Sequence, residues 1–317
     1  MHQKRAVQQP QEPDMNSFAS DFNKCLFKFW TTFCGPRESV LQMPVKCPGG
    51  TSKQLCYGVN PNQAQFAVCY STETKIPLFT GHVLDPNIPE GGGRDADWRS
   101  DPTGRFPPLA QDDDYKAPQN QIIDNYNQQQ QQFFSRGHLT PNADFADADR
   151  RSYTMVTTNI APQWQLFNAA NWAEMERLLR GFATQENHPL YVFTGTSGQA
   201  KNKAGEEIKL NQRVVVPLYY WKAVCDPLHL QSIFFYARNP TDTARADKQE
   251  RGCEEGQQTQ TSGIVKCNSI DDGIQVIEND VPGAILKIPE FTRKKACKPN
   301  EMGALFTEYI RGHANWS

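Results

Sequence analysis

The chain has no long hydrophobic run. Among its 317 residues, no stretch approaches the roughly 18 consecutive apolar residues that a membrane-spanning helix needs. Segment 1–14 also lacks the apolar core of a secretory signal peptide, so we expect that any such leader has already been removed. Hydrophobic residues at 38% and charged residues at 21% are typical of a globular protein, and we expect no membrane partner.

A strong charge of one sign is also missing. The chain carries 33 Lys and Arg against 35 Asp and Glu, for a net charge of −2. Global charge therefore does not predict binding to nucleic acid. Basic residues do cluster locally, at Arg150 and Arg151, over Lys201–Lys209 and over Arg293–Lys298. Such clusters are commonly solvated surface, but an enzyme that acts on nucleic acid needs one beside its site, because phosphate contacts supply much of the affinity.

The nine cysteines contain no Cys-x-x-Cys pair and no Cys/His spacing that suits a structural zinc site. Five lie in the first seventy residues and four in the last hundred. This clustering at the ends favours disulfides in a secreted protein, with a reduced cytosolic protein as the alternative. The odd number leaves at least one thiol free or bonded to another chain.

Apolar periodicity predicts an α+β fold. Residues 1–60 read as an N-terminal extension, polar and then cysteine-rich, followed by a single domain over 61–317. The segment Phe167–Phe182 has the apolar spacing of an amphipathic helix. Loops are expected over 85–118, and mostly irregular structure over 239–280. The predicted strands are a hairpin over Gln65–Leu84 and single strands at Ser152–Thr158, Leu190–Thr194, Val214–Val224 and Leu230–Ala237.

The candidate catalytic residues lie between Phe134 and Arg180. His138 follows Gly137, which permits close approach of the backbone, and a neutral imidazole accepts a proton near pH 7. On a continuous helix, residues four apart form one ridge, and this spacing is shared by Asn168, Trp172, Glu176 and Arg180. Taken alone, Glu176 and Arg180 would be an ordinary ion pair within a helix.

Together these groups suit phosphodiester hydrolysis, which needs a base for water and positive charge for the transition state. His138 offers the base, and Arg136 and Arg180 offer charge. Mg²⁺ keeps several waters, so one side-chain oxygen, that of Asn168, is a sufficient protein ligand. Glu176 is then placed to hold a metal-bound water.

The same segment resembles the DNA/RNA non-specific endonucleases with an Asp-Arg-Gly-His motif, which have the ββα-metal fold with a central antiparallel sheet flanked by helices and long loops. The resemblance is clear over 134–195 and weaker over Gln65–Ala237. The early cysteines and the strand Phe66–Tyr70 resemble the secreted animal branch, with its endonuclease-domain-containing proteins and arthropod extracellular nucleases. The matching residues are Arg136-Gly137-His138-Leu139, Pro141, Thr158-Asn159, Pro162-Gln163, Asn168, Trp172 and Glu176.

The resemblance implies a Mg²⁺-dependent endonuclease of little sequence specificity that cuts DNA, with RNA left open, and leaves 5′-phosphate ends. Mn²⁺ or another divalent metal can substitute. His138 would be the general base and Asn168 the direct metal ligand. Glu176 would act in the outer shell through water, and Arg136 and Arg180 would contact phosphate. Gly137 and Asn159 would be supporting residues. The oligomeric state stays open, with a homodimer as one alternative.

One residue departs from the family pattern: Ser135 stands where the family has Asp. Ser135 still donates and accepts hydrogen bonds but brings no charge. We expect activity to survive. The alternatives are a catalytically weak, secreted nucleic-acid-binding protein on the same scaffold and a matrix protein with a relic site. Two further patterns are set aside, Arg311-Gly312-His313 as a chance repeat of the motif and Asp112–Asp114 as a solvated acidic loop rather than a cation site.

Overall fold

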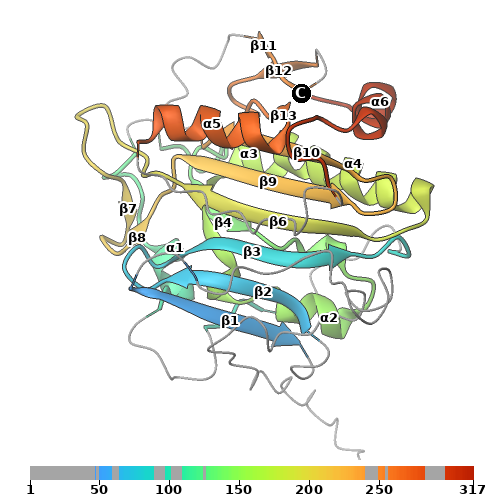
Figure 1. Ribbon diagram of the computed structural model, residues 1–317. Helices are drawn as coiled ribbons and strands as arrows, with labels where there is room; N and C mark the ends of the chain where they lie inside the picture. Colours follow the sequence, from blue (N-terminus) through green and yellow to red (C-terminus); the bar gives the residue numbers. More distant parts are fainter. Residues whose placement is uncertain are drawn as a thin grey trace, which may run out of the picture.

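The computed structural model describes residues 47, 50–58, 64–88, 97–100, 109–123, 126–239, 249–253, 256–282 and 297–317. A seven-stranded sheet forms its centre, in the order β1-β2-β3-β6-β9-β10-β13, and every neighbouring pair is antiparallel (Figure 1). The predicted α+β class with a central antiparallel sheet is confirmed. The strands are β1 (Ser52–Gly58), β2 (Ala64–Ser71), β3 (Ile76–Leu84), β6 (Leu190–Ser197), β9 (Tyr219–Asp226), β10 (Gln231–Arg238) and β13 (Lys266–Asn268).

Alternation along the strands gives the sheet two apolar faces. In β10, Ile233 and Phe235 pack toward α4 (Asn171–Glu186) and α6 (Ala304–His313), whereas Phe234 and Tyr236 pack toward α5 (Ile270–Asp280). Figure 1 shows α5 in front of the sheet and α4 behind it. The sheet is therefore the middle layer of the molecule.

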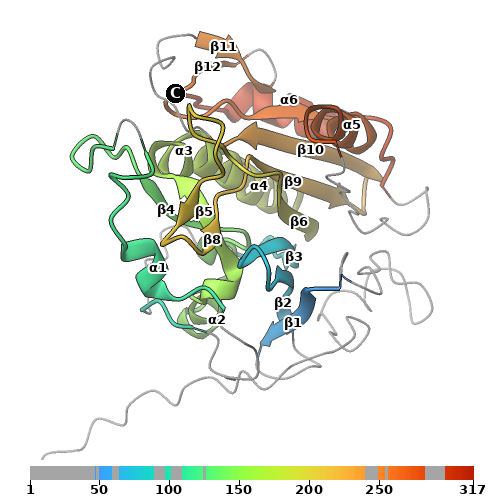
Figure 2. The same ribbon diagram turned by 90° about the vertical axis from the view of Figure 1, so that its left-hand side faces the viewer.

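A small ββα unit covers the α4 face of the sheet (Figure 2). It consists of β4 (Phe134–His138), its antiparallel partner β5 (Ile160–Trp164), and then α3 (Gln165–Ala169) and α4. A single continuous helix was predicted over Phe167–Phe182. This prediction is wrong, because the segment forms two helices, α3 and α4. The backbone leaves the helical region at Ala170 (φ −108°, ψ −104°), and the Asn171 side chain bonds the Gly263 carbonyl at 2.7 Å. Asn168 therefore lies on α3, off the ridge of Trp172, Glu176 and Arg180.

Local capping overrides two other expectations. The strand predicted at Ser152–Thr158 is wrong, because Asp147 caps the short helix α2 (Ala148–Tyr153) by accepting from the Arg150 N–H, and the 3₁₀ turn η4 (Thr157–Asn159) follows. The irregular structure expected over 239–280 is interrupted by α5, which Ser269 caps in the same way. That segment also contains β11 (Gln249–Arg251) and β12 (Gln257–Thr259), which pair with each other.

The strongly β-forming segments are placed as expected. The hairpin over Gln65–Leu84 is β2 and β3, Leu190–Thr194 lies in β6, and Leu230–Ala237 corresponds to β10. Val214–Val224 is split at Pro217, which has no N–H to donate, into β8 (Val214–Val215) and β9. β8 pairs with β7 (Lys209–Leu210). β1 lies inside the expected 1–60 extension and pairs with β2. The division at residue 60 stays a prediction, and the extension falls mostly outside the described residues.

The predicted disulfides are present. Bonds join Cys47 to Cys69, Cys225 to Cys297 and Cys253 to Cys267, and Cys56 is disulfide-bonded as well. Cys25 and Cys34 lie outside the described residues. In the described part of the chain, no helix combines the length and apolar character needed to cross a membrane.

Candidate active site

β4 carries the first candidate residues. His138 ends the strand opposite Ile160 of β5, and Gly137 faces Ala161. A Cβ at Gly137 would lie 2.5 Å from Gln163 Cβ and 2.8 Å from Tyr220 Oη, which is too close for any side chain. Glycine therefore lets β4 press against the face of the sheet, as the sequence predicted.

Trp98 lies against both functional side chains of β4. Its ring is 4.8 Å from the His138 ring, and the Arg136 guanidinium is 5.8 Å from its centroid. Since residues two apart on a strand point the same way, Arg136 and His138 project together beside this indole. Both side chains are half-buried.

Arg136 is held from the other side by α1 (Asp112–Lys116). Its Nε donates to Asp112 Oδ1 at 2.7 Å, and its guanidinium lies 5.8 Å from the Tyr115 ring. The loop expected here is wrong, because the acidic run is helical. Asp112 pairs with Arg136, and Asp114, 1% exposed, accepts from Arg213 at 3.2 Å, whereas the Asp113 side chain is 90% exposed and solvated as expected.

The chain leaving His138 is fixed by Asn159. The Asn159 side chain accepts from the Thr140 N–H at 3.0 Å and donates to the carbonyls of Thr140 and Thr154, at 2.9 and 3.0 Å. Its own carbonyl accepts from the Leu139 N–H at 2.9 Å. These bonds give Asn159 a clear supporting geometry, because they lock the residues that follow His138.

Ser135 and Asn168 are in direct contact. Ser135 Oγ donates to the Gln163 carbonyl at 3.1 Å and accepts from Asn168 Nδ2 at 3.2 Å. With its nitrogen turned to the hydroxyl, the half-buried Asn168 amide turns its Oδ1 the other way. Amide and carboxylate oxygens are the ligands that Mg²⁺ prefers, so the donor set fits a hard divalent cation.

Glu176 lies beside a buried lysine of the central sheet. Lys222, 1% exposed on β9, has its Nζ 3.9 Å from Glu176 Oε1 and donates to Thr194 Oγ1 at 2.6 Å. Burial raises the pKa of Glu176 to about 7, against the opposing effect of the Lys222 charge. Burial also lowers the pKa of Lys222, which the carboxylates of Glu176 and Asp144 partly offset.

Arg180 belongs to the same polar layer. It donates to Asp144 Oδ1 at 3.0 Å, and the other oxygen of Asp144 lies 2.9 Å from His82 Nε2 on β3. Burial raises the pKa of Asp144, but the His82 hydrogen bond and the Arg180 charge outweigh it, and the net shift is downward. Burial lowers the pKa of His82 despite its contact with Asp144.

The structure thus places the predicted residues in three groups: Arg136 and His138 around Trp98, Ser135 with Asn168, and Glu176 with Arg180. His82, Lys222 and the role of Asp144 were not foreseen. Lys222 lies in register with Thr194, which in turn pairs with Thr80, so a polar row crosses the sheet below α4. A lysine inside an otherwise apolar strand was the available signal, because a buried charge requires a partner.

The sequence model of the DNA/RNA non-specific endonucleases matches residues 51–271, which contain all of these groups. The chain belongs to the DNA/RNA non-specific endonuclease family. A salivary endonuclease of Lutzomyia longipalpis is 37% identical over 111 residues, covering 34% of this chain and 27% of the relative. A salivary endonuclease of Culex quinquefasciatus is 29% identical over 110 residues, covering 34% and 30%. The matches therefore span less than a third of each relative's length.

Among solved structures, this family member is similar to a chain in the crystal structure of the EndoG/EndoGI complex. The TM-score is 0.36 with 18% identity, and the alignment covers 56% of this chain and 72% of the other.

Proposed function

We propose that the protein is a Mg²⁺-dependent endonuclease that hydrolyses phosphodiester bonds in DNA, with RNA as a second candidate substrate, cuts with little sequence specificity, and leaves 5′-phosphate ends. The observation that carries this proposal is the β4–β5–α3 arrangement. It projects an imidazole from the end of β4 and orients the Asn168 amide through Ser135.

His138 accepts the proton of the attacking water at an imidazole nitrogen, and the packing of Trp98 against its ring fixes the ring's direction. Asn168 Oδ1 would be the direct protein ligand of Mg²⁺, or of Mn²⁺ in its place. When bound, the metal supplies positive charge for the phosphate oxygens and the leaving group. Glu176, with 16% of its side chain exposed, would accept a hydrogen bond from a water of the metal's outer shell.

Arg136 and Arg180 contact substrate phosphate. Each is already fixed by a carboxylate, Asp112 or Asp144, and retains 22–23% side-chain exposure. A guanidinium has five N–H donors, so one carboxylate leaves others for phosphate. Preorganised charge of this kind stabilises a phosphoryl transition state without reorganisation.

We further propose that the protein is secreted. Its disulfides suit an oxidising compartment, and its relatives are named as salivary endonucleases.

The deciding experiment is digestion of plasmid DNA and of RNA in Mg²⁺, in EDTA, and by the His138→Ala variant. We expect EDTA to abolish cleavage and His138→Ala to lower kcat roughly 10²-fold to 10⁴-fold. The chain supplies a matched control in its second Arg-Gly-His sequence, since His313 is exposed on α6. His313→Ala should cut normally.

Cleavage that survives His138→Ala would show that the base lies elsewhere. Binding of nucleic acid without cleavage in Mg²⁺ or Mn²⁺ would instead favour the alternative, a binding protein weakened by Ser135 in place of the family's Asp.

A further inference from the structure

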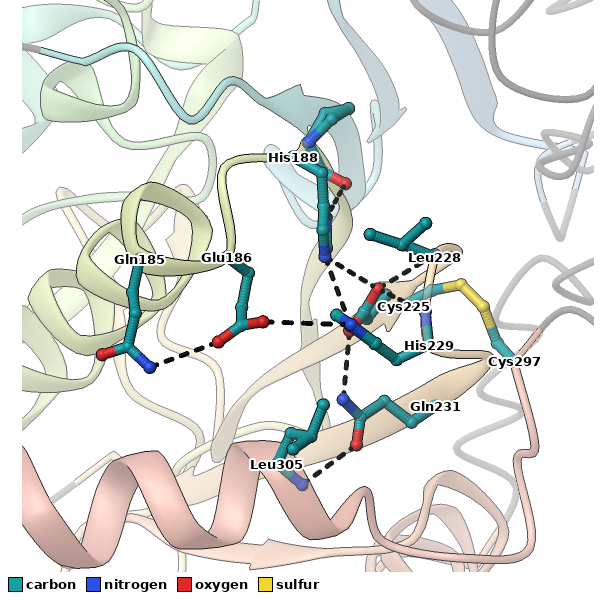
Figure 3. A network of polar contacts seen from close by, with 11 residues as sticks. Gln185, Glu186, His188, Cys225, Leu228, His229, Gln231, Cys297 and Leu305 are labelled. Atoms are coloured by element: carbon teal, nitrogen blue, oxygen red, sulfur yellow. Dashed lines mark hydrogen bonds and ion pairs between the residues drawn. A yellow bond between two sulfur atoms is a disulfide. The ribbon is translucent and has the colours of Figure 1, made fainter.

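A second cluster of ligand-type side chains lies outside the candidate active site (Figure 3). His188 lies between α4 and β6, Asp226 ends β9, and His229 lies in the turn before β10. Asp226 is four residues from Lys222 along β9, roughly 13 Å at the rise of an antiparallel strand. None of the three residues has a role in the proposed cleavage reaction.

Two of the three spacings between the ligand atoms match a tetrahedral ion. His188 Nε2 lies 3.4 Å from His229 Nδ1 and 3.3 Å from Asp226 Oδ1. His229 Nδ1 lies 2.8 Å from Asp226 Oδ2. Zinc bound at about 2.0–2.1 Å to nitrogen and oxygen holds its tetrahedral ligand atoms roughly 3.4 Å apart. The 3.3 and 3.4 Å spacings agree with this value, whereas His229 Nδ1 and Asp226 would have to move apart by roughly 0.5 Å from their hydrogen-bond distance to admit the ion.

The buried carboxylate also calls for a positive charge. Asp226 is fully buried, and His188 Nε2 and His229 Nδ1 lie 3.3 and 2.8 Å from its two oxygens. A buried carboxylate needs charged or hydrogen-bonding partners, and a divalent cation between the two imidazoles would supply that charge.

The surroundings hold these ligands in place. Asp226 is fully buried and accepts from the N–H groups of Leu228 and His229, at 3.0 and 3.1 Å, and from Gln231 Nε2, at 3.0 Å. His188 is 2% exposed, whereas a third of the His229 side chain reaches solvent. The cluster is thus rigid at its base and open at one side, where Glu186 lies 3.9 Å from His229 Nε2.

We propose that His188, Asp226 and His229 form a structural Zn²⁺ site. Two imidazoles and one carboxylate favour zinc over Mg²⁺, which prefers oxygen ligands. The ion would join the end of α4, the start of β6 and the β9–β10 turn. That turn adjoins the Cys225–Cys297 disulfide, so the site reinforces the anchoring of the C-terminal segment. The proposal is independent of the nuclease function.

The test is a calorimetric titration of the tag-free, chelator-treated protein with Zn²⁺ in saturating Mg²⁺, together with the visible absorption of the Co²⁺-loaded form. We expect one equivalent of zinc per chain and the intense absorption of tetrahedral Co²⁺. His229→Gln should remove both, and His313→Gln and Asn168→Ala should keep both. Gln231→Ala should weaken binding roughly 10-fold to 100-fold, because Gln231 orients a ligand without being one.

Melting temperature gives a second readout that does not depend on cleavage. Zinc should raise the Tm of the wild-type protein and leave that of His229→Gln unchanged, since only a ligand that binds the folded state stabilises it. His229 is the most exposed of the three ligands, so this variant is the one best able to fold. The proposal is overturned if wild-type protein binds no zinc at micromolar concentrations, or if His229→Gln binds it equally well.

Discussion

At the residue scale, Ser135 departs from the family pattern but still makes hydrogen bonds at the candidate site. Its hydroxyl bridges the Gln163 carbonyl and the Asn168 amide. A carboxylate at this position could accept from Asn168 but could not donate to a carbonyl. Ser135 therefore orients the proposed metal ligand by hydrogen bonds alone, without adding charge next to the metal.

Replacing Ser135 by Ala should weaken the metal site. Without the hydroxyl the Asn168 amide loses its orienting partner, and the Mg²⁺ concentration for half-maximal cleavage should rise roughly 10-fold to 100-fold. Ser152→Ala is a suitable control, because the Ser152 hydroxyl bonds the Asp149 carbonyl within α2 and, among the described residues, no group of the candidate site. An unchanged Mg²⁺ dependence would remove Ser135 from the site. A large gain in rate on Ser135→Asp would show that the natural chain is impaired.

The residues of the candidate site could be predicted from spacing, but their partners could not. His138, Asn168 and Glu176 lie within 39 positions of one another, so a motif can contain them. His82 and Lys222 lie on strands far away in the sequence, and only the sheet register brings them below α4. Their roles depend on long-range pairing, which no local pattern encodes.

At the element scale, the site depends on how tightly β4 lies on the sheet. Gly137→Ala should destabilise the fold by about 1–3 kcal/mol, because its Cβ would meet Gln163 and Tyr220 and force the strand outward. Cleavage should fall as well, since His138 would move with the strand. Denaturant unfolding measures the first effect and plasmid digestion the second.

The second Arg-Gly-His sequence again provides the control. A Cβ at Gly312 meets no described atom within 4 Å, and this residue lies on α6. Gly312→Ala should be neutral or stabilising by roughly 0.5–1 kcal/mol, as expected for alanine in a helix. Equal losses in the two variants would contradict the packing argument.

At the same scale, helices and strands could be predicted where the apolar residues of a segment followed a single periodicity. The β-branched and aromatic runs of β6 and β10 have a single interpretation. Ser152–Thr158 alternates too, but a single side-chain bond from Asp147 starts a helix just before it. Likewise Asn171 bonds distant backbone and divides one amphipathic pattern into α3 and α4. The bounds of short elements depend on individual side-chain hydrogen bonds of this kind, and the apolar periodicity of a sequence does not contain that information.

At the scale of the whole molecule, His82, Asp144 and Arg180 join three layers: the central sheet, the loop after β4, and α4. His82 is fully buried, and among the described residues its Nδ1 has no hydrogen-bond partner. The neutral ring therefore donates from Nε2 to Asp144. A proton added at Nδ1 would be buried without an acceptor.

The His82 contribution to stability should consequently be lost in acid. The pKa of His82 is lowered in the fold, so the unfolded chain takes up this proton first, near its ordinary value of 6.5, and the contribution falls below that pH by at most about 1.4 kcal/mol per pH unit. Glu176 acts in the opposite direction between about pH 7 and 4.5, because its raised pKa lets the folded carboxyl take up a proton before the unfolded one. The lowered pKa of Asp144 adds a further loss at more acidic pH.

His82→Gln should shift this dependence between pH 6.5 and 5 so that acid destabilises the variant less than the wild-type protein, because a glutamine still donates to Asp144 but does not titrate, and the opposing contribution of Glu176 remains. Urea unfolding at several pH values measures the slope. A variant that keeps the wild-type slope would place the responsible group elsewhere. The exposed His313→Gln substitution should leave the slope unchanged.

Because Trp98 packs against His138, the fluorescence of Trp98 should depend on whether His138 is protonated. A protonated imidazole quenches the emission of an indole in contact with it, whereas a neutral one does so weakly. Trp98 lies against His138, whereas Trp172 is fully buried beside Glu176 and Lys222 and reports a different ionisation. A fluorescence titration, compared with that of Trp98→Phe, should therefore report the ionisation of the proposed base directly, without substrate, metal or label.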